Sequence, residues 1–125
     1  MTGETMAEIL IIDDDRQMRR LISRFLTGAG HTVHEAENGR DGIALFRRVR
    51  PALVITDIMM PDMEGLETIR ELRRDAPTLP IIAISGGNEP IYLRAATSLG
   101  AMAALEKPFV GDEPLRLVAE LLNPS

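Results

Sequence analysis

The chain has 125 residues, of which 45% are hydrophobic and only 3% aromatic, and its formal net charge is -5. Its length is that of one domain with a substantial core, and the absence of cysteine excludes disulfides, thiolate metal sites and thiol nucleophiles. Every apolar run is far shorter than the roughly 20 residues of a membrane helix, and the net acidity disfavours a nucleic-acid surface, so we expect a cytoplasmic protein.

Short apolar runs alternate with amphipathic stretches along the chain. The runs expected to be strands are residues 7–12, 32–36, 52–56, 81–85 and 103–106. Several are rich in Ile, Leu and Val without strict alternation, which is typical of strands buried on both faces. Apolar residues recur at helical spacing at positions 18–26, 66–72 and 115–122. Further helices are expected at about 40–49, after the Asn38-Gly39 turn, and from 90 onward. The chain is therefore predicted to be one α/β domain over residues 1–125, with a core of about 7–122.

Polar residues mark the starts of several predicted helices. Asp15 is interpreted as a helix cap rather than a functional group. Asn88 before Pro90 and Asp112 before Pro114 are typical of helix starts with a capping side chain and a proline in the first turn. Met18 and Leu21, on the first helix, are predicted to belong to the core, with docking onto the helices of a partner protein left open for Met18. The arginines at positions 16, 19, 20, 47, 48, 50, 70, 73 and 74 are interpreted as solvated helix faces.

Polar or charged residues also follow four of the five predicted strands. They are Asp13-Asp14-Asp15, Asp57, Ser85 and Lys107. Ligands of open parallel sheets bind at the carboxyl ends of the strands, and helix capping does not explain complementary groups at four strand ends. If the first strand lies between the second and third, the carboxylates of Asp13, Asp14 and Asp57 converge.

Such a cluster favours a cation. Two carboxylates about 5 Å apart repel by roughly 3 kcal/mol at an effective dielectric of 20. Oxygen ligands without His or Cys suit Mg²⁺, which often shares its coordination with phosphate oxygens. A carboxylate beside that ion can attack phosphorus and carry a phosphoryl group, while Lys107 neutralises phosphate charge and Ser85 donates a hydrogen bond. The pattern therefore predicts phosphoryl-transfer chemistry.

These segments resemble the receiver domain of bacterial two-component response regulators over about residues 7–122. The motifs that carry the resemblance are Ile11-Ile12-Asp13-Asp14-Asp15, the run from Ile55 through Asp57 and Pro61 to Gly65, Ile84-Ser85-Gly86 and Lys107-Pro108-Phe109. The resemblance implies a flavodoxin-like (βα)5 three-layer sandwich whose five-stranded parallel sheet has the order 2-1-3-4-5. It also implies a cis bond before Pro108.

The resemblance further implies a role for each site residue. Asp57 accepts a phosphoryl group from a sensor histidine kinase or a histidine phosphotransfer protein. Asp13, Asp14, Asp57 and the backbone carbonyl of Met59 hold Mg²⁺, while Ser85 and Lys107 bind the phosphate. Such a domain is a switch rather than a turnover enzyme, and it is expected as a monomer or a phosphorylation-dependent dimer. Its downstream protein partner is unknown, and the 125 residues are expected to contain no output domain.

One position departs from the family pattern. Ala104, three residues before Lys107, stands where receivers usually carry a switch aromatic. In that family the aromatic side chain rotates inward when the domain is phosphorylated. Here either the loop from Ser85 to Glu89 or Tyr92 is expected to transmit the effect of phosphorylation instead. Gly86 and Gly87 make this loop flexible and open the approach of water to Asp57, which predicts a fairly short-lived phosphoryl group. The departure leaves open a scaffold that works without phosphorylation.

Two other functional classes fit the residues less well. A haloacid dehalogenase-type phosphatase needs a nucleophile at Asp13 and a later acidic pair after its lysine, but only Asp112, Glu113 and Glu120 follow Lys107. A flavodoxin-like electron carrier needs hydrogen-bond donors to phosphate in the loop after the first strand, whereas that loop is acidic here.

Overall fold

The computed structural model describes residues 6–60, 65–86, 90–109 and 111–123. Within them, strands and helices alternate in the order β1 (Glu8–Ile12), α1 (Arg16–Gly28), β2 (Thr32–Ala36), α2 (Gly39–Val49), β3 (Leu53–Asp57), α3 (Gly65–Asp75), β4 (Ile81–Ser85), α4 (Pro90–Leu99), β5 (Ala103–Glu106) and α5 (Glu113–Leu122). The predicted strands are confirmed to within one residue. No helix in these ranges is long and apolar enough to cross a bilayer.

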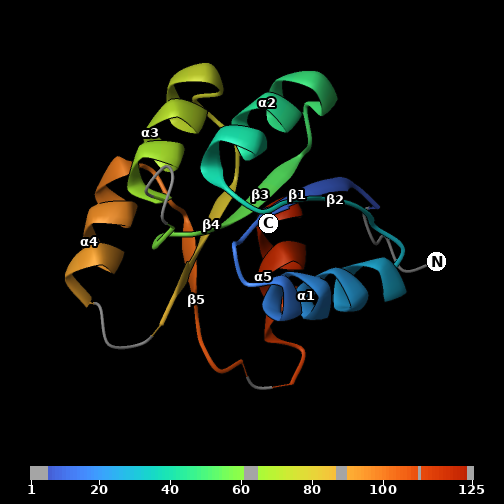
Figure 1. Cartoon of the computed structure of the whole chain (residues 1–125). Helices are drawn as coiled ribbons and strands as arrows, with labels where there is room; N and C mark the ends of the chain where they lie inside the picture. The colour runs from blue at the N-terminus through green and yellow to red at the C-terminus, as the bar shows by residue number, and fades with distance from the viewer. Residues whose placement is uncertain (1–5, 61–64, 87–89, 110, 124–125) are drawn as a thin grey trace.

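The five strands form one parallel sheet in the order β2-β1-β3-β4-β5. β1 therefore lies between β2 and β3, which is the condition for bringing the carboxylates together. Figure 1 shows α1 and α5 on one side of the sheet and α2, α3 and α4 on the other. The flavodoxin-like three-layer sandwich implied by the resemblance is confirmed.

Each face of the sheet has its own apolar core. Successive side chains of a strand point to opposite faces, so Ile9 and Ile11 pack toward α1 and α5, whereas Leu10 and Ile12 pack toward α2, α3 and α4. All four side chains are fully buried. The sheet is thus covered on both faces, and its buried aspartates Asp13 and Asp57 lie at the strand ends.

The helix starts were predicted with mixed success. Asp15 caps α1 by accepting hydrogen bonds from the backbone N–H groups of Gln17 and Met18. Asp112 does precede α5, but its side chain makes no capping hydrogen bond. It lies 3.7 Å from Arg116 instead, so the predicted cap there is wrong. The predicted cap at Asn88 falls outside the described residues.

Three predicted side-chain locations on the helices are also wrong. Leu21 is 40% exposed and is not a core residue. The Arg19 side chain is only 11% exposed, because it pairs with Glu35. Arg73 donates hydrogen bonds to the carbonyls of Ala76, Leu79 and Gly100. These two arginines are structural contacts rather than members of a solvated face.

Gly65, the first residue of α3, lies against the end of β3. An added Cβ there would overlap the carbonyl oxygen of Asp57 and the Cα atom of Ile58. Because these are backbone atoms, the helix itself must move to make room. We expect Gly65→Ala to lower the free energy of unfolding by about 1–3 kcal/mol, measured by urea denaturation.

Gly28→Ala is the matched control for this substitution. Gly28 is also helical, and an added Cβ there meets nothing within 4 Å. Removing backbone freedom from the unfolded chain should stabilise this variant by about 0.5–1 kcal/mol. Equal effects of the two substitutions would contradict the close approach at Gly65.

Candidate functional site

The ends of four neighbouring strands meet at one edge of the sheet. Asp13 follows β1 directly, Asp57 and Ser85 end β3 and β4, and Lys107 follows β5. Asp13, Asp57 and Ser85 are buried, at 0%, 6% and 1% exposure, whereas Asp14 is exposed. One carboxylate oxygen from each of Asp13, Asp14 and Asp57 lies within 4.8 Å of the others. The predicted convergence of the three carboxylates is confirmed.

Lys107 lies on the far side of this cluster. Its Nζ atom is 3.6 Å from Oδ2 of Asp57 and 3.8 Å from Oδ2 of Asp13. Its backbone N–H donates to the Ser85 carbonyl at 2.8 Å, which ties the end of β5 to β4. The Lys107–Pro108 bond is cis, as the resemblance implies. One ammonium group thus faces two buried carboxylates.

The two oxygens of Asp13 have different surroundings. Oδ1 accepts a hydrogen bond from the Asp15 backbone N–H at 2.9 Å. Oδ2 is buried without a hydrogen-bond partner in the described structure. A buried carboxylate oxygen that lacks a donor is costly. The nearest cationic atom to Oδ2 in the described structure is Nζ of Lys107, at 3.8 Å. Oδ2 can therefore bind a cation or accept a further hydrogen bond.

Burial changes the acidity of both buried carboxyls. Burial, reinforced by the negative charge of Asp57, raises the pKa of Asp13 to about 7, against the partial opposition of the Asp15 N–H and Lys107. Burial also raises the pKa of Asp57, while the Met59 N–H and Lys107 counteract it. The cluster is therefore short of positive charge at neutral pH.

The donor set fits Mg²⁺. The cluster offers carboxylate oxygens and no His or Cys, which suits a hard cation that keeps part of its water. The unpartnered Oδ2 of Asp13 and the exposed Asp14 are suitable first ligands. The Met59 N–H donates to Oδ1 of Asp57 at 3.1 Å, which fixes the Met59 peptide beside the cluster. Use of the Met59 carbonyl as a ligand stays a prediction.

The surroundings of Ala104 bear on how the site communicates. Ala103 and Leu105 pack with the core beside α1 and α5, so Ala104 between them points to the opposite face. It is half-buried. Tyr92, on α4 of that face, is 39% exposed. Neither residue fills the place of a buried aromatic in β5.

Sequence reasoning missed the contact of Arg19 with the site. Its Nη1 donates to the Asp13 carbonyl at 2.7 Å, and its Nε donates to Glu35 at 2.9 Å. The available signal was that Glu35 shares a strand face with Val33, which packs against the core on the side of α1 and α5. A charged residue on the inner face of an edge strand needs a partner.

Comparison with known proteins identifies close similarity throughout the domain. Residues 9–120 match the family described as "Response regulator receiver domain". The chain is 37% identical over 115 residues to the response regulator MprA of Mycolicibacterium vanbaalenii, covering 92% of this chain and 50% of that protein. It is 37% identical over 106 residues to the transcriptional regulatory protein AfsQ1 of Streptomyces coelicolor, covering 85% and 47%. The chain thus spans about half the length of these curated relatives.

Solved structures agree with this similarity. The chemotaxis response regulator CheY4 of Vibrio cholerae has a TM-score of 0.86 at 29% identity, with 94% of this chain and 99% of that one covered. The receiver domain of NtrX from Brucella abortus has a TM-score of 0.88 at 29% identity, with the same coverage.

The raised pKa of Asp13 predicts how stability depends on pH. Because the folded state binds this proton more tightly than the unfolded chain, the metal-free protein should lose stability as the pH rises from about 4 to about 7. Asp13→Asn keeps the side chain neutral. In EDTA at pH 8 we expect the variant to exceed wild type in free energy of unfolding by about 1–3 kcal/mol, and at pH 4 to match it, by urea denaturation.

Asp75→Asn is the control for this prediction. Arg47 lowers the pKa of Asp75. Asp75 is the last residue of α3 and is far from the carboxylate cluster. Its loss should therefore lower stability at pH 8 rather than raise it. An Asp13→Asn variant that is less stable than wild type at pH 8 in EDTA would show that the buried charge is already compensated.

Proposed function

The chain belongs to the response regulator receiver domains of two-component signalling systems, and we propose that Asp57 is its phosphoacceptor. The observation that carries this proposal is the pairing of a buried carboxylate at the end of β3 with Lys107, 3.6 Å away, beside two further carboxylates. Asp57 is close to both the ammonium group and the candidate cation site. Asp13 shares these neighbours, with its Oδ2 3.8 Å from Nζ of Lys107, and the choice of Asp57 as the acceptor follows the motif by which the chain resembles receiver domains.

Asp13, Asp14 and Asp57, with the Met59 carbonyl, are proposed to hold Mg²⁺. When bound, Mg²⁺ supplies charge neutralisation for phosphate oxygens and for the attacking carboxylate. The unpartnered Oδ2 of Asp13 supports this assignment. Asp15 is a cap and a donor to Asp13 and is not proposed as a ligand.

The proposed reaction is transfer of a phosphoryl group to Asp57. An oxygen of Asp57 attacks phosphorus of a phosphohistidine, the P–N bond breaks, and its electron pair remains on the imidazole nitrogen. Lys107 neutralises charge on the transferred group, and the Ser85 hydroxyl donates a hydrogen bond to one of its oxygens. Water later attacks phosphorus, the bond between phosphorus and the Asp57 oxygen breaks, and inorganic phosphate leaves as the carboxylate is restored. The domain catalyses both steps on its own side chain, so it is a switch rather than a turnover enzyme in the usual sense.

The proposed partners follow from this reaction. Receiver domains interact with histidine kinases, and the specific donor here is a sensor histidine kinase or a histidine phosphotransfer protein. The output is a changed protein-binding surface read by a downstream protein. We propose no direct contact of this domain with nucleic acid or membrane, and a cytoplasmic location. We also propose that residues 1–125 act as a single receiver domain, as a monomer or a phosphorylation-dependent dimer.

The central test is direct phosphorylation. Incubation with acetyl phosphate and Mg²⁺ should add one phosphoryl group, seen by intact mass, and Asp57→Ala should abolish it because the nucleophile is lost. Asp75→Asn is the matched control, since its carboxylate lies far from the site, and it should label normally. EDTA should prevent labelling of both the wild-type chain and Asp75→Asn. Absence of labelling with every phosphodonor would instead favour the scaffold that works without phosphorylation.

Ala104 leads to a second prediction, because its side chain has no rotamer to change. We expect beryllofluoride with Mg²⁺ to shift the NMR signals of Gly86 and of the Tyr92 ring, and not those of Asp57→Ala. If both signals stay in place, neither the loop after β4 nor Tyr92 transmits the change.

Hydrolysis of the phosphoryl group should be complete well within hours, and a longer lifetime would contradict open water access to Asp57.

A further inference from the structure

Arg19 differs from the other arginines of α1, a helix that is described in full. Its side chain is 11% exposed, whereas that of its neighbour Arg20 is 56% exposed. Both side chains approach Glu35, with Nε at 2.9 Å in Arg19 and 3.9 Å in Arg20. Arg19 alone of the two donates in addition to the carbonyl of Asp13, at 2.7 Å. It therefore connects the edge strand β2 to the loop that carries the acidic residues.

The carbonyl that Arg19 binds belongs to the peptide unit between Asp13 and Asp14. The N–H of Asp13 donates to the Ala36 carbonyl at 3.1 Å, and its Oδ1 accepts from the Asp15 N–H. Arg19 adds a charged donor at the Asp13 carbonyl. The contact fixes the plane of the peptide from which two proposed cation ligands project, so a small rotation there would move both carboxylates.

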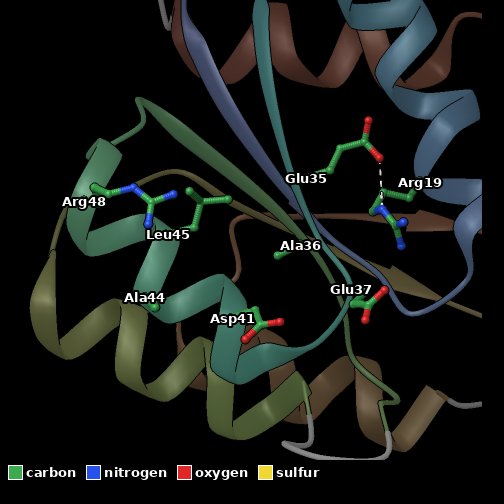
Figure 2. Close-up of a pocket in the computed structure, with 8 residues that line it drawn as sticks. All are labelled: Arg19, Glu35, Ala36, Glu37, Asp41, Ala44, Leu45 and Arg48. Carbon is green, nitrogen blue, oxygen red and sulfur yellow. Dashed lines mark hydrogen bonds and ion pairs between the residues drawn. The ribbon is translucent and has the colours of Figure 1, made fainter.

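Arg19 is held mainly by polar contacts. It lines a hollow of about 430 Å³ together with Glu35, Glu37, Asp41 and Arg48. Figure 2 shows Glu35 and Arg19 joined at one side of this hollow, with Glu37 and Asp41 separate from them. The Arg19–Glu35 ion pair borders this hollow, so side-chain packing does not enclose it on that side. The hydrogen bonds to Glu35 and to the Asp13 carbonyl therefore determine where the guanidinium group lies.

We propose that Arg19 is a positioning residue for the cation site: it holds the Asp13–Asp14 peptide in the orientation that binds Mg²⁺, and Glu35 holds Arg19. This inference rests on the proposed function. Arg19 touches neither the cation nor the phosphoryl group. The guanidinium suits the task because its several N–H groups can serve two acceptors in fixed directions, whereas an ammonium group at the same position has no such geometry.

The test measures Mg²⁺ affinity of the 125-residue chain by isothermal titration calorimetry. Arg19→Met should raise the Kd for Mg²⁺ about tenfold, in the range of substitutions that orient metal ligands from behind. Arg19→Lys should raise it about threefold, because one acceptor can still be served. The Mg²⁺ concentration that gives half the maximal labelling rate with acetyl phosphate should rise in parallel, while the rate at saturating Mg²⁺ stays within about twofold of wild type.

Two control variants separate positioning from general stability. Arg20→Met removes an arginine from the adjacent position without touching Asp13. Arg47→Met removes the 2.8 Å ion pair with Asp75 between α2 and α3, and it should lower the melting temperature. Both should leave the Kd within about twofold of wild type. Glu35→Gln, which weakens the hold on Arg19, should raise the Kd.

The possible outcomes are distinguishable. An unchanged Kd in Arg19→Met, with a lower melting temperature, would mean that Arg19 only joins α1 to β2 and would overturn the inference. If Arg19→Met does not fold, Arg19→Lys and Glu35→Gln decide: a higher Kd in either supports positioning, and no change in both refutes it. Failure of the wild-type chain to bind Mg²⁺, or labelling of Asp57→Ala, would overturn the proposed function itself.

Discussion

The crowding of buried carboxylates against one ammonium group is the constraint on which the site depends. Asp13 and Asp57 are withdrawn from water at the edge of the sheet, and in the described residues Lys107 is the cation within 4 Å of both. Burial raises the pKa of both buried carboxyls. The single positive charge of Lys107 does not balance the charges of Asp13, Asp14 and Asp57 together. A cation bound by this cluster would relieve the imbalance only in the folded state and would therefore also stabilise the fold.

The sequence allowed the strands and their ends to be predicted because both depend on local pattern. A strand buried on both faces must be apolar until it reaches the sheet edge, and that is where Asp13, Asp57 and Ser85 stand. The strand order is a different matter. Five βα units can be arranged in several ways that all obey right-handed crossovers, so the order came from the resemblance, and the structure confirmed it.

Contacts between distant segments were beyond the sequence patterns. The apolar periodicity of α1 locates its buried face but not the width of that face, so Leu21 was wrongly placed in the core and Arg19 on the surface. The position of Arg19 depends on Glu35, sixteen residues away, and therefore on how α1 crosses β2. Arg73 is similar, because its acceptor Gly100 lies on the far side of α4. At Asp112, a local pattern failed because the side chain faces Arg116 instead of the helix N-terminus.

The same contacts constrain how a change at Asp57 could reach the surface. Arg73 fastens the turn after α4 through the Gly100 carbonyl, and the N–H of Ala101 donates to the Ala96 carbonyl, so the carboxyl end of α4 is anchored. Its other end carries Ile91 and Tyr92, which are 67% and 39% exposed and have little packing to lose. The amino-terminal half of α4 is therefore the part of this helix that can move with the least loss of packing. Its exposed apolar side chains are of the kind that suits recognition by another protein.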